Sequence, residues 1–512
     1  MPAYLKALVV ILALASVVFA IAKVPACAMA STGPDFVRRR NLWFGITLIG
    51  FFAHNFWLYM FGGAILLLIG QVKEANKLAL YFLLLFALPP IQKTISAGSM
   101  SVFDIHYYRL LALTILLPSY LLLRRTNAEP FGRLLPDKLI GLYMVLTLVL
   151  YLGVSSFTNS FRYGVIYNFT DIFLPYYVAS RSLNDIQRFR DSLMAFVVAA
   201  LMLSATGIFE FLRHWLLYAD LEGLLGARSV LSHYVTRGTN LRALATVGGA
   251  IPLGYVIAVA IGLHMYLRKV VPNTNLWILG LLLLIGGIVS SLSRGPWVGA
   301  ALICMIVVAT SPLLLRNLIR IALVGIVLSP LLFFTEKGQH LLEYLPFVGK
   351  IQSENVDYRR QLIEVSMVVL MKNPFFGSFN YLQAPEMQVL MQGQGIIDIV
   401  NTYIGVVLSF GLVGLSLFAG FFTTIALGIF TTMRKIKDHS DERYILGQAL
   451  FATWIGIMAT IFTVSSITAV PVVYWAMAGV GVAYIRLLAP KVASRARLRG
   501  GRLQSPRPTP VR

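Results

Sequence analysis

The chain has 512 residues, of which 58% are hydrophobic and only 12% are charged. Ordinary globular domains carry about 25% charged residues, so this composition excludes a conventional soluble domain. The formal net charge of +22 does not indicate nucleic-acid binding, because the basic residues lie in short links between apolar runs and in a tail at 491–512. We therefore expect no nucleic-acid partner. We interpret the charge as a signal of membrane topology, with contacts to anionic membrane lipids.

Apolar runs of about 15–25 residues recur along the chain, as membrane-spanning helices require. They predict an all-α polytopic integral membrane protein with about 12–15 transmembrane helices. We expect one transmembrane domain over 1–490, followed by a basic, disordered cytoplasmic tail at 491–512. The expected spans are 7–24, one or two crossings within 42–70, 78–90, 106–123, 138–155, 160–179, 192–212, 247–267, 275–291, 296–312, 318–334, 401–430, 444–466 and 470–488.

The apolar run 42–70 is longer than one crossing needs, since a single helix of that length would extend about 43 Å. One crossing would also place the arginines at 38–40 and the lysines Lys73 and Lys77 on opposite sides of the membrane. A tight hairpin at His54-Asn55 keeps both basic clusters inside, although each arm is then short. We favour the hairpin and leave the single crossing open.

The basic links between the other predicted spans indicate the orientation of the chain in the membrane. Counted back from the basic tail, each cytoplasmic link is basic, as the positive-inside rule requires. The basic residues of these links are Arg124, Arg125, Arg133, Lys138, Arg181, Arg188, Arg190, Arg268, Lys269, Arg316, Arg320, Arg434, Lys435, Lys437 and Arg443. Three segments should then face the periplasm: 213–246, the turn 290–294 and the long loop 336–399.

The loop 336–399 is the only long polar interruption of the apolar pattern, and such loops are usually functional. Within it, polar and apolar residues alternate with helical spacing over 359–371, which predicts a helix lying on the membrane surface. Asn373-Pro374 should end that helix, because proline removes a donor and restricts the preceding residue.

Arginines on the outer side are unexpected under the positive-inside rule, so each needs an explanation. The candidates are Arg237, Arg242, Arg294, Arg359 and Arg360. A guanidinium group presents a planar fork of donors suited to phosphate oxygens. Arg294 also stands at a predicted helix start, where free amide groups favour an anion. The alternative is contact with lipid headgroups or with the nearby acidic residues Glu354, Asp357 and Glu364.

Three segments together resemble the O-antigen polymerase/O-antigen ligase superfamily of bacterial envelope glycosyltransferases, over about residues 240–430. The first is Leu241-Arg242-Ala243 with Gly248-Gly249 and Pro252, and the second is Ser291-Leu292-Ser293-Arg294-Gly295. The third runs from Arg360 through Asn373-Pro374-Phe375-Phe376-Gly377 to Asn401-Thr402-Tyr403 and Gly411-Leu412-Val413-Gly414-Leu415. The specificity lies in the order and spacing of these segments.

The resemblance implies transfer of a glycan from undecaprenyl pyrophosphate to a hydroxyl group, at the periplasmic face of the bacterial inner membrane and without metal or cofactor. Arg242 and Arg294 match the family arginines thought to hold the pyrophosphate. We expect Arg237, Arg359, Arg360, Asn401 and Tyr403 to contact substrate. The sequence contains no Asp-x-Asp or His-x-x-x-His pattern, and neither Cys27 nor Cys304 belongs to a cluster of metal ligands.

Family ligases carry a histidine immediately before the asparagine that opens the span after the long loop, and this chain has Val400 there. Asp398 is the nearest candidate for the general base that would deprotonate the acceptor hydroxyl. The alternatives are that Asp398 only caps the next helix, or that His340 or His233 is the base.

The missing histidine favours an inverting polymerase of exopolysaccharide or O-antigen repeat units. A ligase that passes glycan to a lipid or protein remains open, as does a polysaccharide transporter or flippase. Transporters usually show repeated halves and charges at the membrane midplane, whereas here the polar residues gather at one face. A polymerase would have a flippase and a chain-length regulator as partners.

Overall fold

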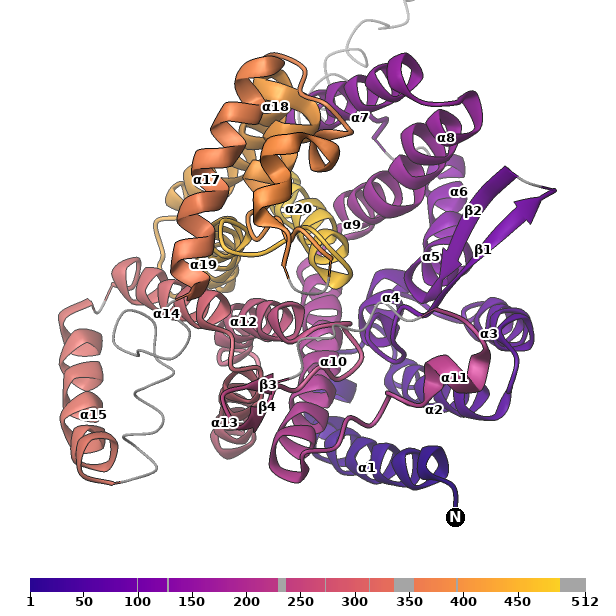
Figure 1. Ribbon diagram of the computed structural model, residues 1–512. Helices are drawn as coiled ribbons and strands as arrows, with labels where there is room; N and C mark the ends of the chain where they lie inside the picture. Colours follow the sequence, from indigo (N-terminus) through magenta and orange to yellow (C-terminus); the bar gives the residue numbers. More distant parts are fainter. Residues whose placement is uncertain are drawn as a thin grey trace, which may run out of the picture.

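The computed structural model describes residues 1–98, 100–126, 129–228, 236–271, 273–312, 314–335, 354–392 and 395–488. These residues form a bundle of helices (Figure 1). In this part of the chain, seven helices are long and apolar enough to cross a membrane. They are α1 (Ala3–Met29), α7 (Leu135–Val154), α10 (Ile186–Arg213), α12 (Ala250–Leu267), α18 (Thr402–Arg434), α19 (Glu442–Ile461) and α20 (Ala469–Leu488). The predicted all-α polytopic membrane fold is confirmed.

The other predicted spans are shorter or interrupted helices. Three are short apolar helices: α3 (Phe56–Gly70), α13 (Thr274–Ser290) and α14 (Arg294–Ala309). Two helical runs contain a π-helical stretch, and a further helix precedes the long loop. These are α5 (Tyr107–Leu111) with η1 (Ala112–Leu116) and α6 (Leu117–Arg125); α8 (Phe157–Phe161) with η2 (Arg162–Phe173) and α9 (Leu174–Ser182); and α15 (Leu314–Phe334). The tail 491–512 lies outside the described residues.

The hairpin predicted within 42–70 is confirmed, because α2 (Asp35–Phe52) and α3 are two separate helices that pack on each other. His54 adopts a left-handed conformation with φ of 47° and reverses the chain. The side-chain oxygen of Asn55 then accepts hydrogen bonds from the amides of Trp57 (2.9 Å) and Leu58 (3.2 Å), which caps α3.

The predicted span 78–90 is only partly helical, since α4 (Lys77–Leu84) ends before Pro89-Pro90. The buried segment that follows leads into an antiparallel ribbon of β1 (Gln92–Ala97) and β2 (Met100–His106), which the all-α prediction did not include. A second, very short pair, β3 (Thr236–Arg237) with β4 (Asn240–Leu241), follows α11 (Leu221–Leu225).

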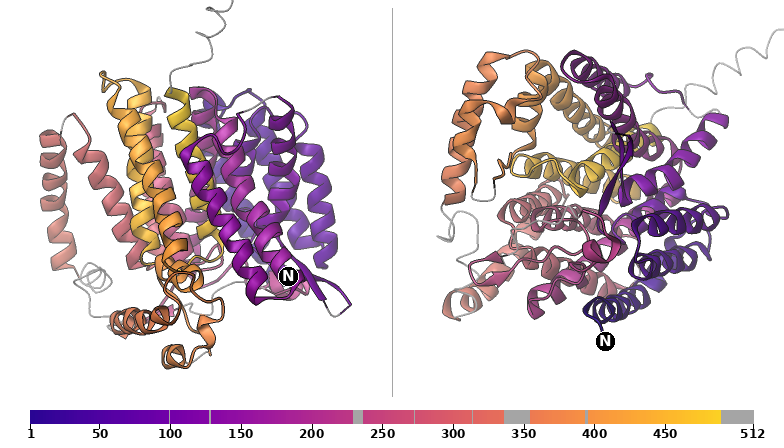
Figure 2. Two further views of the ribbon diagram at one scale, coloured as in Figure 1. Left: turned by 90° about the horizontal axis from the view of Figure 1, so that it is seen from above. Right: turned by 45° about the vertical axis from the view of Figure 1, so that its right-hand side comes forward.

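The polar segments divide between the two ends of the bundle. Figure 2 shows α17 (Glu354–Lys372) and the β1–β2 ribbon at one end, while α20 finishes at the other. The helix predicted within the long loop is therefore present, and it stops immediately before Asn373-Pro374 as expected. The first part of the long loop, 336–353, lies outside the described residues.

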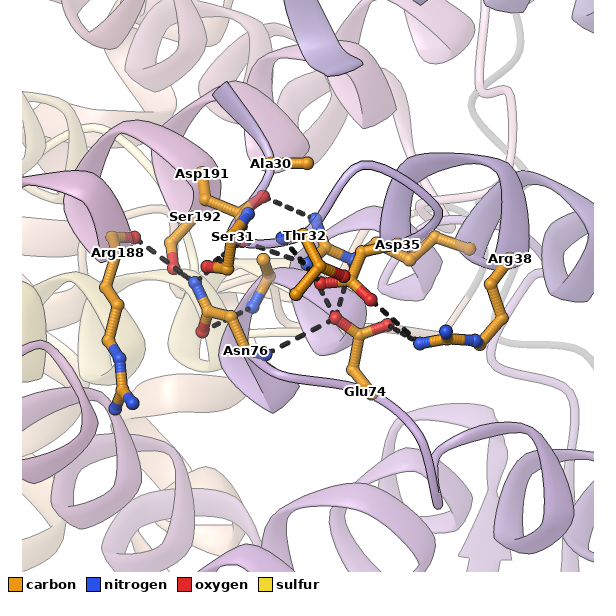
Figure 3. A network of polar contacts seen from close by, with 12 residues as sticks. Ala30, Ser31, Thr32, Asp35, Arg38, Glu74, Asn76, Arg188, Asp191 and Ser192 are labelled. Carbon is orange, nitrogen blue, oxygen red and sulfur yellow. Dashed lines mark hydrogen bonds and ion pairs between the residues drawn. The ribbon is translucent and has the colours of Figure 1, made fainter. Parts of the chain in front are cut away.

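Ion pairs between separate helices join the basic links at the opposite end. Figure 3 shows one network, in which α2 contacts the start of α4 and the start of α10. Arg39, only 2% exposed, donates to Glu74 (2.6 Å) and to Asp191 (2.6 Å). The links predicted to share one side of the membrane therefore lie together. Further pairs there join Arg181 to Asp137, Arg190 to Glu442, and Arg486 to Glu129.

Candidate functional site

A cavity of about 1180 Å³ opens among the segments at the end of the bundle that carries α17. Its polar lining comes from connecting segments between helices and from helix ends, while Tyr143 of α7 and Tyr474 of α20 contribute from the membrane helices. Segments far apart in the sequence meet here. They are 236–252, 293–296, 358–359, 381–382, residue 392 with 396–410, and 463–467, within which the lining residues fall.

Two of the predicted arginines are hydrogen-bonded to the turn before α14. Arg242 donates from Nη2 to the Ser293 hydroxyl (2.9 Å) and from Nε to the Ser291 carbonyl (3.3 Å). Arg237, 7% exposed, donates from Nη1 to the Leu292 carbonyl (2.5 Å). Both side chains are thereby held against one turn at the cavity wall.

The third arginine, Arg294, follows directly after the same turn. Arg294 is the first residue of α14, is half-buried and lines the cavity. Burial lowers the pKa of Arg242 to about 10, and the neighbouring Arg237 adds to this effect. Arg242 nevertheless stays protonated near neutral pH, so the wall has three positive side chains. Such a wall suits an anion with several oxygens, such as a pyrophosphate.

Asp398 lies in a second polar cluster that lines the same cavity. The hydroxyl of Ser465 donates to its Oδ1 (2.7 Å), and the hydroxyl of Tyr358 donates to its backbone carbonyl (2.9 Å). Burial raises the pKa of Asp398, while the Ser465 hydrogen bond and the charge of Arg359 partly offset the rise. A half-buried carboxylate with a raised pKa has the properties of a general base.

Arg359 links the two clusters. Its Nη2 donates to the Thr463 carbonyl (3.4 Å) in the turn between α19 and α20. Burial lowers the pKa of Arg359, the charge of Asp398 raises it, and the charge of Arg294 lowers it. Gly295 allows the close approach of α14, since a Cβ there would lie 2.3 Å from the Thr463 hydroxyl. The carboxylate therefore lies near the positive wall.

The interpretation of Asp398 as a helix cap is wrong. Asn401 caps α18, because its side-chain oxygen accepts from the amides of Tyr403 (2.9 Å) and Ile404 (3.2 Å). Asn401 also lines the cavity, so its contact with substrate stays a prediction.

Two further expectations require correction. Arg360 does not line the cavity; its side chain is 83% exposed and donates to Glu364 (3.3 Å), because it lies on the outer face of α17. Tyr403 does not line the cavity either, and its hydroxyl donates to the Met458 carbonyl (3.1 Å) in α19. The alternative bases His340 and His233 lie outside the described residues.

The turn that carries Ser465 was not predicted from the sequence. The predicted span 444–466 placed this residue within the membrane, whereas α19 ends at Ile461. The polar run Thr463 to Thr468, which contains Ser465 and Ser466, was the available signal. Tyr358 was also missed, although it directly precedes Arg359.

The Asn373–Gly377 motif packs against the kink in α18. Gly411 interrupts α18 with φ of 65°, and the segment after α17 supplies partners for the freed backbone groups. The amide of Leu412 donates to the Pro374 carbonyl (2.8 Å), and the amide of Ser378 donates to the Leu408 carbonyl (2.8 Å). The motif is therefore a docking element between the loop and α18.

Among the described residues, no group of three or more His, Cys, Asp and Glu side chains is placed to hold a metal ion. The comparison with protein families matches residues 279–419 to the family described as O-antigen ligase. This range includes Arg294, Arg359 and Asp398, but not Arg237 or Arg242. A search of curated proteins found no match. Residues 279–419 are therefore similar to O-antigen ligases, and this match supports the resemblance of the chain to the O-antigen ligase/polymerase superfamily.

Proposed function

We propose that the protein is a glycosyltransferase that polymerises undecaprenyl-pyrophosphate-linked oligosaccharide repeat units at the periplasmic face of the bacterial inner membrane. The observation that carries this proposal is one cavity lined both by Arg237, Arg242 and Arg294 and by Asp398. Positive side chains that can bind an anion, together with a half-buried carboxylate in the same cavity, are the groups that glycan transfer from a pyrophosphate donor requires.

The shape of the lining fits the donor. Arg237, Arg242 and Arg294, here called the arginine wall, bind the pyrophosphate. Apolar and aromatic side chains from the membrane helices offer a surface for the polyprenyl chain. These side chains are Tyr143, Ile251, Val406, Phe410 and Tyr474. The donor glycan then extends into the part of the cavity that carries hydroxyl and amide groups. These are the side chains of Tyr381, Gln392 and Ser409.

In the proposed reaction, Asp398 accepts the proton of the acceptor hydroxyl as that oxygen attacks the anomeric carbon. The bond from this carbon to the pyrophosphate oxygen breaks, and the leaving group keeps the electron pair. Arg242 and Arg294 stabilise the negative charge that develops on it. Attack from the face opposite the leaving group inverts the anomeric configuration, and the chain's own residues perform both roles without a metal.

Polymerisation is favoured over ligation because Val400 occupies the position where ligases of the family carry a histidine, and the candidate base Asp398 lies two residues earlier in the chain. A ligase acting on a lipid or protein acceptor is the second candidate, since the family match is common to both. A polymerase would work beside a flippase and a chain-length regulator. A transporter is less compatible with a half-buried carboxylate that shares a cavity with several arginines.

The test is a single substitution with a matched control. Arg294→Ala should abolish chain growth at unchanged protein level, since one lost contact of this kind costs about 3–4 kcal/mol of barrier. Arg294→Lys should restore little, because a point charge does not replace a bidentate fork. Arg360→Ala removes an exposed arginine outside the cavity and should leave chain growth normal.

The assay is incubation of the purified protein with an undecaprenyl-pyrophosphate-linked oligosaccharide, followed by separation of products by length. A ladder of increasing repeat number supports a polymerase. Transfer of one glycan to an added lipid acceptor, without a ladder, would instead support a ligase. Near-normal products from Arg294→Ala would overturn the proposed site.

A further inference from the structure

Glu210 is a buried acidic residue whose role the proposed reaction does not include. It lies near the end of α10 that approaches the cavity segments, and it is 1% exposed. Its Oε2 accepts hydrogen bonds from the amides of Leu244 (2.9 Å) and Ala245 (2.9 Å), and its Oε1 accepts from the amide of Leu217 (3.1 Å). One carboxylate therefore joins the connection after α10 to the segment between β4 and α12.

These contacts require a group that only accepts hydrogen bonds. All three partners are backbone N–H donors, and both carboxylate oxygens are used. A glutamine could satisfy the amides of Leu244 and Ala245 with its oxygen, but its NH₂ group would then face the amide of Leu217. The two oxygens of the glutamate side chain can both accept, so glutamate matches this arrangement better than glutamine does.

The segment that Glu210 holds has a strained backbone. Ala245 has φ of 46°, in the left-handed region that residues with a side chain rarely adopt. Such a conformation persists only where the surroundings impose it. Further contacts fix the neighbouring residues, since the amide of Ala243 donates to the Ser290 carbonyl (3.1 Å) and the hydroxyl of Thr246 donates to the Phe86 carbonyl (2.7 Å).

Arg242 immediately precedes this fixed segment. Its guanidinium reaches the cavity wall and the Ser293 hydroxyl from a backbone whose next residues are tied to α10 and α13. If the backbone relaxed at Ala245, the Arg242 guanidinium would move from its position in the cavity wall. Small displacements of a preorganised charge cost much of its catalytic effect.

We propose that Glu210 is the positioning residue of Arg242: its carboxylate holds the strained turn at Leu244-Ala245 and thereby directs Arg242 at the leaving group of the donor. This inference rests on the proposed function. Glu210 does not touch substrate, because it does not line the cavity. It acts through Arg242.

A double-mutant cycle tests the proposal. The variants are Glu210→Gln, Arg242→Ala and the double variant, and Glu222→Gln serves as control because Glu222 is an exposed acid on the nearby helix α11. The readout is the initial rate of glycan transfer with an undecaprenyl-pyrophosphate-linked oligosaccharide. Glu210→Gln should lower kcat tenfold or more in the wild-type background, and less than twofold when Arg242 is already alanine. Glu222→Gln should change neither.

An equal fold-loss from Glu210→Gln in both backgrounds would overturn the proposal, because a merely structural role lowers the rate regardless of Arg242. If Arg242→Ala alone has normal activity, the proposed function is at fault instead. Should Glu210→Gln fail to accumulate, Glu210→Asp replaces it in the same cycle: it keeps the acceptors but shortens the reach by one methylene. A loss that depends on Arg242 then supports the proposal, and an equal fold-loss in both backgrounds overturns it.

Discussion

The hydroxyl of Ser465, in the turn between α19 and α20, donates a 2.7 Å hydrogen bond to Oδ1 of Asp398, in the segment before α18. The contact orients the carboxylate and leaves Oδ2 as the oxygen through which it would take a proton. It also stabilises the ionised form of a half-buried acid. The relationship joins residues 67 positions apart in the chain.

Asp398→Asn should lower the rate of glycan transfer by about 10²–10⁴-fold, because it keeps the shape of the side chain but removes the proton acceptor. Donor binding should persist, since the arginine wall is intact. The control is Arg360→Ala, which removes an exposed side chain outside the cavity and should act normally. Normal chain growth by Asp398→Asn would show that the base lies elsewhere.

The rate should fall on the acidic side with a midpoint above the ordinary aspartate range near a pKa of about 4, because burial raises the pKa of Asp398. The base works when deprotonated, so a raised pKa moves the loss of activity to higher pH. Ser465→Ala removes a hydrogen bond that lowers this pKa and should move the midpoint higher still. Ser466→Ala, which removes a contact to Tyr474 instead, should leave the midpoint unchanged.

Gly411→Ala should strongly destabilise the protein. A Cβ there would lie 2.2 Å from the carbonyl carbon and oxygen of Phe375, and φ of 65° already costs a side-chain-bearing residue about 1–3 kcal/mol. Gly420→Ala, in the same helix, meets nothing closer than 3.9 Å (Leu139) and should be neutral or slightly stabilising. Thermal unfolding in detergent compares the two, and equal midpoints would contradict the docking role of the kink.

Arg39→Ala should reduce stability by about 3–5 kcal/mol, because Glu74 and Asp191 would remain buried without their cation. Arg40→Ala removes a neighbouring arginine whose side chain donates to the exposed Asn41 and should have a small effect. Accumulation in membranes and the unfolding midpoint are the measurements. A mild Arg39→Ala phenotype would show that the network in Figure 3 is dispensable.

The orientation predicts opposite labelling at the two ends of the bundle. In a protein whose Cys27 and Cys304 are replaced by alanine, Val389→Cys should react with an impermeant thiol reagent in spheroplasts, because η4 (Pro385–Leu390) lies in the long loop and Val389 is 66% exposed. Asp438→Cys, in the exposed link between α18 and α19, should react only after lysis. The reverse pattern would invert the topology and move the cavity to the cytoplasm.

The sequence by itself determined the membrane class, most span positions and the residues of the arginine wall. Apolar length, basic links and helix-ending motifs are local properties, so they predicted the hairpin at His54-Asn55 and the end of α17 before Asn373-Pro374. Arg237, Arg242 and Arg294 stood out because each is a charge on the side where positive charge is disfavoured.

The tertiary structure alone decided which polar side chains face one another. Asp398 and Asn401 are three positions apart, and only the contacts show that the asparagine caps α18 while the aspartate meets Ser465. Helical periodicity did not separate Arg359, which lines the cavity, from its exposed neighbour Arg360. Glu210 falls within the predicted span 192–212, and nothing in the sequence indicated its role. The three amides that donate to it lie 7, 34 and 35 positions away in the chain. Hydrogen bonds across such separations depend on how helices pack, which no local pattern records.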